Sequence, residues 1–384
     1  MKKLVIATGI FSPDIGGPAT YSQLLLRKLS AYGYEAIVVT YGTTQPQDTT
    51  AIIRVSRKWP KGIRHCIYGW QVWRAARRAD AVFIQGVGGE GIPAMWAARI
   101  AHKPIVLKVV GDYAWEQATQ RCGIMESIDQ FQSKHYTGWP KRWQKAQRRV
   151  AQSAQWIITP SEYLRKLVSG WGVSEDKIRV VPNAVVISKN VCRKEEARTE
   201  CGMGGTMLVS IGRLVPWKGF SLLIEVVAEL RAELPDIQLV IIGDGPERKM
   251  LDFKIKSLNL EKHVRLIGAV PKEVVQRYLC AADLFVLNTG YEGFSHQIIE
   301  AMAAGVPVLT TKNGGNPEII NHGQNGWLVE YNNAPELQAA IRKLCIDVNT
   351  RIFLSKAGQE TAAQFSEERM LSLLRVILDR VCES

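Results

Sequence analysis

The sequence predicts an α/β protein with two Rossmann-like domains, each built on a parallel sheet, and three observations support this. The chain has 384 residues, more than twice the roughly 150 of an average domain. Short β-branched runs alternate with helical patterns in both halves, as in βαβ units. A polar, charged stretch at 186–206 separates the halves and is predicted to be a linker. The expected domains are 1–185 and 207–365, and a C-terminal helix over 366–384 is expected to pack back on the first domain.

The expected strands are short, apolar and bounded by polar residues or glycine. In the first half they are Leu4–Thr8, Ala36–Tyr41, Ala81–Gln85, Ile105–Val110, Trp156–Thr159 and Ile178–Val181. In the second half they are Met207–Ile211, Gln238–Ile242, Val264–Ile267, Leu284–Leu287 and Val306–Leu309. The clearest helical patterns are Tyr21–Ala31, Gly91–Ala101, Phe220–Leu234 and Ser366–Val381. Ligands are expected where the carboxyl ends of the parallel strands meet.

Composition points to a cytoplasmic protein without a metal site. No apolar run reaches the roughly 20 residues that cross a bilayer, and the apolar start is interrupted too early for a signal peptide. The seven cysteines form no C-x-x-C pair, which argues against a disulfide framework or a zinc site. No H-x-H, H-E-x-x-H or D-x-D pattern occurs, so no metal and no cofactor are expected.

The positive charge is concentrated in the first half. Residues 1–182 carry 26 Lys and Arg against 12 Asp and Glu, and the remainder carries 23 against 24. Nine of the eleven tryptophans also lie in this part. An anionic partner is therefore expected there, and charge alone permits nucleic acid, an anionic membrane or a phosphorylated substrate.

Two glycine-rich loops follow strands of the first half. The loop from Gly9 to Pro18 contains Gly16 and Gly17 at the start of a helix, where backbone N–H groups can approach an anion. A tight turn explains the same pattern equally well. The second loop, Gly86-x-Gly88-x-x-Gly91, formally matches a dinucleotide fingerprint. Several strands precede it, whereas the fingerprint normally follows the first strand, so we discount that reading.

The second half carries a stronger phosphate-binding pattern. Arg213 and Lys218 lie between a strand and a helix, within Gly212-Arg-Leu-Val-Pro-Trp-Lys-Gly219. A planar guanidinium, an ammonium and a helix N-terminus together can bind a diphosphate. Two solvated surface cations are the alternative. Gly243 opens the next strand-to-helix junction, and it supplies either a close backbone approach or a turn.

The most informative stretch runs from Tyr291 to Pro307. It places Glu292 in a loop and Glu300 in the following helix, eight positions apart. Helix geometry puts His296 and Glu300 on one face. Carboxylates at such positions are costly unless they meet hydroxyl groups, and a sugar–ribose diphosphate offers hydroxyls on both sides of an anion. Exposed glutamates explain either residue alone, but they explain the whole pattern poorly.

These motifs together resemble the retaining glycosyltransferases of family 4, which have the GT-B fold of two Rossmann-like domains facing a central cleft. The resemblance covers nearly the whole chain and is most pronounced from 207 to 330. It rests on Glu292-x7-Glu300, Gly-Arg213…Lys218-Gly, Gly243-Asp-Gly-Pro-Glu, Glu-Ala-Met-Ala-x-Gly-x-Pro307, the Gly16-Gly17 loop and Val181-Pro-Asn183.

The resemblance implies roles for matching residues. Arg213 and Lys218 would hold the donor diphosphate and stabilise the leaving group, and Glu300 would bind the nucleotide ribose. Glu292, with Gly293, Phe294 and Ser295, would hold the transferred sugar. The remaining donor contacts implied are Gly16, Gly17, Gly243, Gly268 and Val270. Many members have a histidine near the reacting sugar; here Asp112 occupies that place, so its contribution to catalysis is left open. A second departure is Ala184, where glycine commonly follows Pro-Asn.

The expected reaction moves a hexose-type sugar from a UDP- or GDP-sugar to an acceptor oxygen, with retention of configuration. No carboxylate nucleophile emerges from the pattern, which favours same-face attack without a metal. Two segments combine tryptophan with basic residues, as in helices that rest on anionic lipid. They contain Trp70, Trp73, Arg74, Arg77, Arg78, Trp139, Arg142 and Trp143. A lipid-linked or envelope-glycan acceptor and a peripheral position on the inner face of the membrane are therefore expected; a basic solvated helix face is the alternative.

Three other readings of the sequence stay open. A nucleotide-sugar epimerase of the same fold would convert the donor without an acceptor, although the two spaced glutamates favour transfer. A nucleic-acid-binding protein is permitted by charge, but no zinc finger or aromatic RNA-binding signature appears, so no nucleic acid is expected. An NAD-dependent oxidoreductase rests only on the discounted Gly86–Gly91 pattern.

Overall fold

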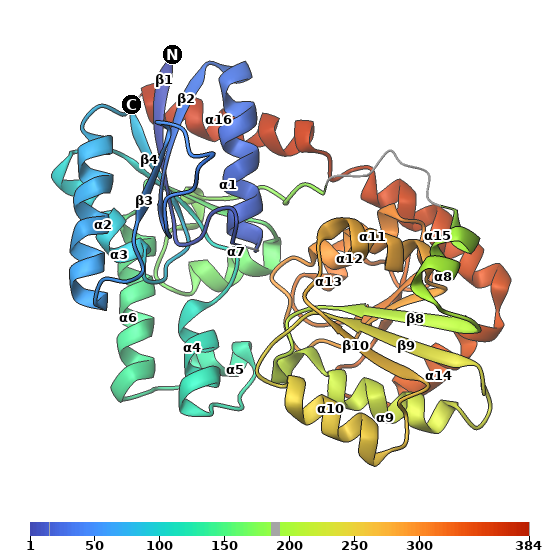
Figure 1. Ribbon diagram of the computed structural model, residues 1–384. Helices are drawn as coiled ribbons and strands as arrows, with labels where there is room; N and C mark the ends of the chain where they lie inside the picture. Colours follow the sequence, from blue (N-terminus) through green and yellow to red (C-terminus); the bar gives the residue numbers. More distant parts are fainter. Residues whose placement is uncertain (15, 186–192, 384) are drawn as a thin grey trace. The chain divides into compact units, whose positions relative to one another are not determined.

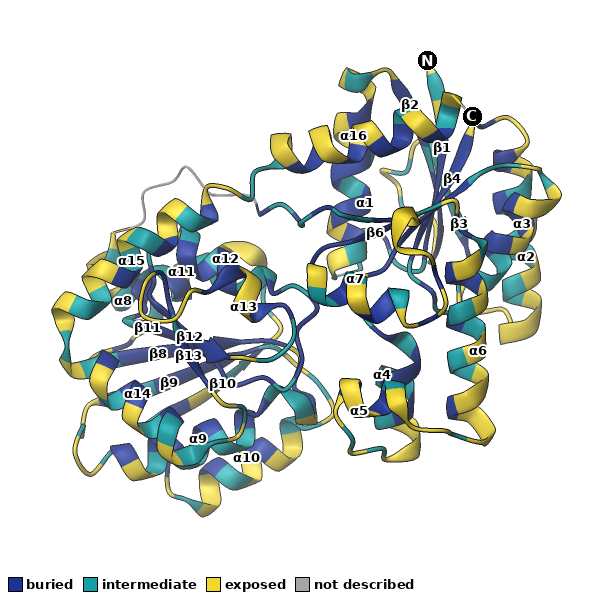
Figure 2. Cartoon of the chain, turned by 180° about the vertical axis from the view of Figure 1, so that it is seen from behind, coloured by how far each residue is buried: buried dark blue, intermediate teal, exposed yellow. Residues whose placement is uncertain are grey.

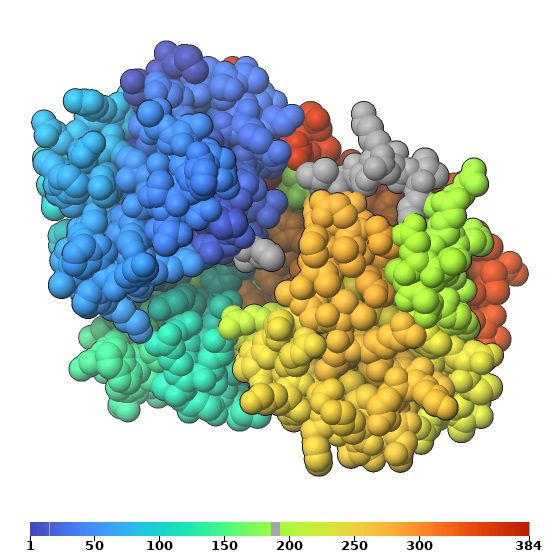
Figure 3. Space-filling view, viewed as in Figure 1, coloured from blue at the N-terminus to red at the C-terminus, as the bar shows by residue number. Residues whose placement is uncertain are grey.

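The computed structural model describes residues 1–14, 16–185 and 193–383, and it divides the chain into two compact units (Figure 1). The first unit comprises Met1–Val181 together with Leu371–Ser384, and the second comprises Pro182–Met370. In the space-filling view, the blue-to-cyan residues of the first unit pack together, as do the yellow and orange residues of the second (Figure 3). The first unit is therefore built from two separate pieces of the chain.

The first unit alternates strands and helices along most of its length. Its elements are β1 (Lys2–Thr8), α1 (Gly17–Lys28), the 3₁₀ helix η1 (Leu29–Tyr32), β2 (Tyr34–Tyr41), β3 (Ile52–Val55), α2 (Lys61–Ala76), β4 (Ala81–Gln85), α3 (Gly91–Ile100), β5 (Ile105–Lys108), α4 (Tyr113–Cys122), α5 (Ile128–Ser133), α6 (Gly138–Ser153), β6 (Trp156–Thr159), α7 (Glu162–Ser169), η2 (Glu175–Lys177) and β7 (Ile178–Val180).

The seven strands form one parallel sheet in the order β3-β2-β1-β4-β5-β6-β7. Leu4 of β1 pairs with Ala36 of β2 on one side and with Ala81 of β4 on the other. The inner strands, such as β4, are buried on both faces because helices cover both faces of the sheet, which explains their continuous apolar runs (Figure 2). The chain reverses its winding direction between β1 and β4, so the loops that follow these two strands flank the switch point of the sheet.

The second unit repeats this architecture. Its elements are α8 (Lys194–Cys201), β8 (Thr206–Ile211), η3 (Pro216–Lys218), α9 (Phe220–Leu230), β9 (Ile237–Ile242), α10 (Arg248–Ser257), β10 (Val264–Gly268), α11 (Lys272–Ala281), β11 (Leu284–Leu287), α12 (His296–Ala303), β12 (Val308–Thr311), α13 (Asn316–Ile319), β13 (Trp327–Val329), α14 (Ala334–Ile346) and α15 (Val348–Ala362). Its six strands are parallel in the order β10-β9-β8-β11-β12-β13, and the winding reverses between β8 and β11.

Alternate residues of the second sheet fill two separate cores. Leu208 and Val286 face a core shared with α9 and α14. Val209 and Phe285, one position along, face the other core with α11 and α12. This two-sided burial, with helices on both faces of each sheet, confirms the predicted fold class of two Rossmann-like domains.

The last helix, α16 (Glu367–Glu383), packs with its C-terminal part on the first unit. Leu374, Leu378 and Val381 are buried. Asp379 accepts a hydrogen bond from the Tyr34 hydroxyl at 2.6 Å and pairs with Lys2 Nζ at 2.9 Å. These two interactions lower the pKa of the Asp379 carboxyl. The two ends of the chain accordingly lie side by side (Figure 1).

The structure adds elements that the sequence analysis did not contain. β3 and β13 are short strands at the sheet edges. Residues 186–192 of the predicted linker lie outside the described residues, and the rest of that stretch holds α8, which packs on α11. The β12 strand begins at Val308 rather than Val306.

The sequence argued against a disulfide framework, and one cysteine departs from that expectation. The described free thiols are Cys66, Cys122, Cys201, Cys345 and Cys382. Cys280 on α11, by contrast, is disulfide-bonded.

None of the helices in the described ranges combines the length and the apolar character that crossing a bilayer requires.

Candidate functional site

The loops after β8 and β11 lie together at the switch point of the second sheet. The Gly290 N–H donates to the Trp217 carbonyl at 2.7 Å, and the Asn288 side-chain amide donates to the Gly219 carbonyl at 3.2 Å. These bonds join the end of one central strand to the end of the other. The predicted phosphate-binding loop and the predicted sugar-binding loop are therefore one structural site.

Lys218 and Glu292 form an ion pair at this site. The Lys218 ammonium contacts Glu292 Oε1, and the two side chains are only 11% and 10% exposed. Lys218 ends the η3 turn, and Gly219 follows it with φ +57°, which lets the chain enter α9 directly. The structure thus brings together two of the residues that the sequence predicted to act on a donor.

Glycines bring the backbones of neighbouring loops into contact around this pair. A Cβ on Gly243 would lie 1.9 Å from the Gly212 carbonyl oxygen. A Cβ on Gly314 would lie 2.2 Å from the backbone carbonyl oxygen of Glu292. The Gly243 N–H also donates to the Gly268 carbonyl at 2.9 Å. Gly243 and Gly268, both predicted donor contacts, consequently lie at adjacent strand ends.

The start of α12 contributes a third part of the site. Ser295 is the N-cap, and its buried hydroxyl accepts a hydrogen bond from the Ile298 N–H. Glu300 lies one turn beyond His296 and pairs with Lys272 Nζ at 3.3 Å. Lys272 starts α11 two residues after Val270, so Glu300 faces the segment predicted to meet the nucleotide base. Gly293 and Phe294 complete the loop between Glu292 and the cap.

Arg213 follows β8 on the same loop as Lys218, but its side chain is exposed. Its carbonyl accepts a hydrogen bond from the Val215 N–H at 2.9 Å. The guanidinium is thus exposed at the carboxyl end of β8, where an anion can reach it.

In the first unit, Gly16 and Gly17 lie at the N-terminus of α1. Gly16 is the N-cap residue and Gly17 the first helical residue, and no atom of the described residues beyond the chain neighbours lies within 4 Å of a Cβ built on Gly17. No acidic side chain lies in the first turn of this 12-residue helix. Among the described residues, the backbone N–H groups at this helix end therefore have space in front of them, and an anion contact there stays a prediction.

Asp112 has a different environment from the one implied by the resemblance. It is the N-cap of α4 and is completely buried. One oxygen accepts from the Trp115 N–H and the other from the Gln132 amide, both at 2.8 Å. Burial raises the pKa of the Asp112 carboxyl, although these hydrogen bonds act to lower it. Both carboxylate oxygens thus have hydrogen-bond partners inside the first unit, and Asp112 caps the helix that follows β5.

Two ionisable residues that the sequence analysis missed line a cavity of about 210 Å³ at the switch point of the first sheet. Glu90 follows β4, and Lys108 ends β5. Burial raises the pKa of Glu90 to about 7 and lowers the pKa of Lys108 to about 7. Lys108 Nζ lies 3.6 Å from the centre of the Tyr21 ring. The signal for Glu90 was the discounted glycine pattern: a Cβ on Gly86 would lie 2.7 Å from Glu90 Oε1, so the loop closes around its own carboxylate.

The raised pKa of Glu90 predicts a pH-dependent stability. Between its ordinary value of 4.5 and about 7, the folded protein retains a proton that the unfolded chain loses, so stability falls as the pH rises through this window. Between pH 5 and pH 8 this ionisation should lower the free energy of unfolding by an amount on the order of 2–3 kcal/mol. We expect Glu90→Gln, which cannot ionise, to lack this decrease. Thermal denaturation of both proteins at pH 5 and pH 8 measures this. An equal pH dependence in the two proteins would contradict it.

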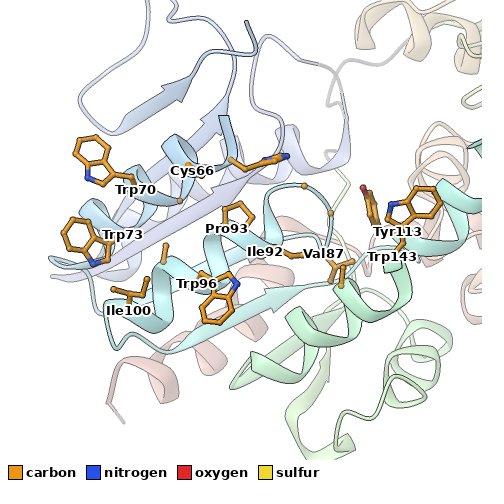
Figure 4. Close-up of a pocket in the computed structure, with 16 residues that line it drawn as sticks. Cys66, Trp70, Trp73, Val87, Ile92, Pro93, Trp96, Ile100, Tyr113 and Trp143 are labelled. Carbon is orange, nitrogen blue, oxygen red and sulfur yellow. The ribbon is translucent and has the colours of Figure 1, made fainter. Parts of the chain in front are cut away.

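A second, larger cavity of about 680 Å³ lies among α2, α3 and α6 of the first unit (Figure 4). Three of the predicted acceptor or membrane residues, Trp70, Trp73 and Trp143, line it. Trp96, which the sequence analysis did not single out, lines it as well. The other predicted members lie outside the lining, namely Arg74, Arg77, Arg78, Trp139 and Arg142. Arg74 and Arg77 nevertheless stand over Trp70 and Trp73, 5.6 and 5.2 Å from the ring centres.

Comparison with known proteins agrees with this two-part architecture. The profile of the 4-like glycosyl transferase domain matches residues 16–184, and that of the glycosyl transferases group 1 matches residues 193–361. The two matches together cover most of both units. The chain therefore belongs to the glycosyltransferases of GT-B type, family 4, which confirms the resemblance noted in the sequence.

Individual relatives share only part of this chain. The lipopolysaccharide core biosynthesis glycosyltransferase LpsE of Rhizobium meliloti is 32% identical over 52% of this chain and 56% of its own length. A 2-deoxystreptamine N-acetyl-D-glucosaminyltransferase of Niallia circulans is 36% identical over 33% of this chain and 32% of its own. The chain thus spans about a third to a half of the length of these curated relatives.

Solved structures match the chain over its whole length. Anabaena HepE in complex with UDP-glucose has a TM-score of 0.78 at 20% identity, covering 100% of both chains. WaaG, a glycosyltransferase involved in lipopolysaccharide biosynthesis, has a TM-score of 0.73 at 16% identity, covering 97% of this chain and 98% of its own. At such identities the likeness supports the fold.

Proposed function

We propose that this glycosyltransferase moves a hexose-type sugar from a UDP- or GDP-sugar to a lipid-linked or envelope-glycan acceptor, with retention and without a metal. The observation that carries the proposal is the Lys218–Glu292 pair, which joins the loops of the two central strands in the second sheet. A cation for a diphosphate and a carboxylate for sugar hydroxyls lie side by side there. HepE, a neighbour in fold, has been solved with UDP-glucose bound.

In the proposed reaction, Arg213 and Lys218 face the diphosphate and Glu292 binds the sugar. The bond between the anomeric carbon and the diphosphate oxygen breaks, and its electron pair leaves with the phosphate. The acceptor oxygen forms its bond to the same face of that carbon, and its proton passes to the departing phosphate oxygen. Cations fixed opposite the developing charge stabilise this transition state more than the ground state.

Nucleotide binding tests the donor half of the proposal. Free UDP or GDP at about a hundred times its Kd should stabilise the protein by about 2.7 kcal/mol in a thermal denaturation experiment. NAD at the same concentration should have little effect. Stabilisation by NAD alone would favour an oxidoreductase. Conversion of the donor sugar to its epimer without any acceptor would favour the epimerase.

Glu300→Ala is expected to weaken the binding of the nucleotide-sugar roughly 10- to 100-fold, because a charged hydrogen bond to a ribose hydroxyl is lost. Titration with the nucleotide that stabilises the wild-type protein measures this. Glu229→Ala, at an exposed position of α9, is the matched control and should leave the affinity unchanged. Lys272→Ala removes the ion-pair partner of Glu300 alone. An equal loss in Lys272→Ala would show that the pair, rather than a ribose contact, matters.

We further propose that the enzyme acts as a peripheral membrane protein on the cytoplasmic face. The supporting feature is the group of arginines that stand over exposed tryptophans on α2, α3 and α6. Such pairs place a cation and an amphipathic ring at one surface, where both can meet lipid head groups.

A further inference from the structure

The large cavity of the first unit has an apolar lining. Four tryptophan side chains contribute to it from three helices (Figure 4): Trp70, Trp73, Trp96 and Trp143. Ile92, Pro93 and Ile100 also line the cavity. Its volume of about 680 Å³ falls within the range of roughly 300–1,000 Å³ that is usual for ligand sites. A site of this size and composition suits a hydrocarbon group.

The lining offers little to a sugar or a nucleotide. Among the residues that the structure describes, the lining contains no carboxylate, lysine or arginine, and its one histidine is His65. Burial, followed by the nearby charges of Arg64 and Lys61, lowers the pKa of His65, so the imidazole is neutral at pH 7. A polar ligand would lose its hydrogen bonds to water here without replacing them. The chemistry of the cavity therefore selects an apolar occupant.

The helices around the cavity carry positive charge only. Neither α2, α3 nor α6 contains an aspartate or a glutamate within its bounds. Arg99 and Arg149 both stand over the Trp96 ring, 5.9 and 4.9 Å from its centre. Exposed guanidinium groups beside an apolar cavity complement the negative surface of an anionic bilayer. The charge pattern thus points to a hydrocarbon chain that comes from such a bilayer.

The apolar cavity adjoins the polar cavity of Glu90 and Lys108. Val87, Gly88, Gly89 and Tyr113 line both. The loop after β4 therefore borders both a hydrocarbon-like space and a space with a carboxyl and an amine. A molecule with an apolar chain and a polar head fits this arrangement if its head enters the smaller cavity.

We propose that the cavity among α2, α3 and α6 holds the hydrocarbon chain of the acceptor lipid, and that the head group of this lipid enters the adjoining cavity beside Glu90 and Lys108. This inference rests on the proposed glycosyltransferase function. It narrows the acceptor to a membrane lipid that places a single long chain in this cavity. The exposed arginines contact anionic head groups of the bilayer from which the chain is drawn.

Two variants of the full-length chain test whether this cavity binds a hydrocarbon chain. Ala146→Trp adds a ring to the lining, and Ile100→Glu places a charge at a lining position that is 63% exposed and so tolerates the change in the fold. Ala31→Trp, at an exposed position of η1 away from the cavity, is the matched control. The probe is n-dodecyl phosphate below its micellar concentration, with n-butyl phosphate as the head-only comparison, and binding is followed by calorimetry.

We expect one dodecyl phosphate to bind per chain in the wild-type protein and in Ala31→Trp, with butyl phosphate at least tenfold weaker. Both lining variants should weaken dodecyl phosphate at least tenfold, since excluding a few methylene groups from an apolar site has an effect of this size. Equal binding in all four proteins, or equal binding of the two phosphates, would overturn the proposal.

A second measurement separates this inference from the proposed function. The lining variants should keep the wild-type response to UDP or GDP in thermal denaturation, because Lys218, Glu292 and Glu300 lie in the other unit and none of the donor contacts predicted in the first unit lines the cavity. Loss of dodecyl phosphate binding with an intact nucleotide response supports the groove. Dodecyl phosphate binding without any nucleotide response would instead contradict the proposed donor, while the proposed lipid cavity would remain supported.

Discussion

Lys218→Met is expected to lower the rate of sugar transfer roughly 10²- to 10³-fold, the largest effect on activity that we predict. The ammonium is the buried cation of the site, and a preorganised group that faces a developing negative charge has about this effect on turnover. The change also leaves the Glu292 carboxylate without its partner, which should reduce the free energy of unfolding by about 3 kcal/mol. Turnover of the donor and urea denaturation measure the two effects.

A double variant distinguishes catalysis from folding at this position. Lys218→Met combined with Glu292→Gln removes both charges, so most of the lost stability should return while the activity stays low. Lys249→Met, at an exposed position of α10, should match the wild-type protein in both measurements. Wild-type turnover in Lys218→Met would refute the assignment of this lysine to the leaving group.

Gly314→Ala is expected to reduce the free energy of unfolding by roughly 2–4 kcal/mol, the largest effect on stability that we predict. Gly314 has φ +63°, and a Cβ there would meet the oxygen, nitrogen and carbonyl carbon of Glu292 at 2.2, 2.9 and 3.0 Å. Relief of this contact requires movement of the loop that carries Glu292. Donor binding should therefore weaken together with stability, and urea denaturation and nucleotide titration measure the two.

Gly323→Ala isolates the steric part of that effect. Gly323 has φ +74°, but no atom of the described residues beyond its chain neighbours lies within 4 Å of its Cβ position. It should therefore show only the left-handed backbone cost of about 1 kcal/mol and normal donor binding. Equal losses in the two variants would mean that the contact with Glu292 is unimportant.

Much of the fold could be predicted because the central strands are buried on both faces. Ala81–Gln85, Trp156–Thr159 and Leu284–Leu287 were predicted with the bounds that the structure shows. The short strands β3 and β13 were missed; each lies at one edge of its sheet, with a neighbouring strand on one side only. Ile52 and Trp327, for example, are only partly buried, so no continuous apolar run marks their strands.

The candidate site was predictable where local spacing determines it. Lys218 and Glu292 follow two strands that the sequence identified, and the order of the sheet then brings their loops together. Asp112 could not be assigned in this way, because its partner Gln132 lies 20 residues along the chain and is found only in the folded protein. Glu90 was hidden for a similar reason: its carboxyl is buried by a glycine loop whose pattern also suits a dinucleotide.

The return of α16 to the first unit makes the second unit an insertion between two pieces of the first. Separation of the units therefore takes two breaks in the chain, one near Val181 and one near Met370. A fragment that stops at the first break would leave Tyr34 and Lys2 without Asp379 and expose the surface that Leu374 and Leu378 cover. The last turns of α16 thus stabilise β1 and the start of β2. A truncation at either terminus should therefore destabilise the other.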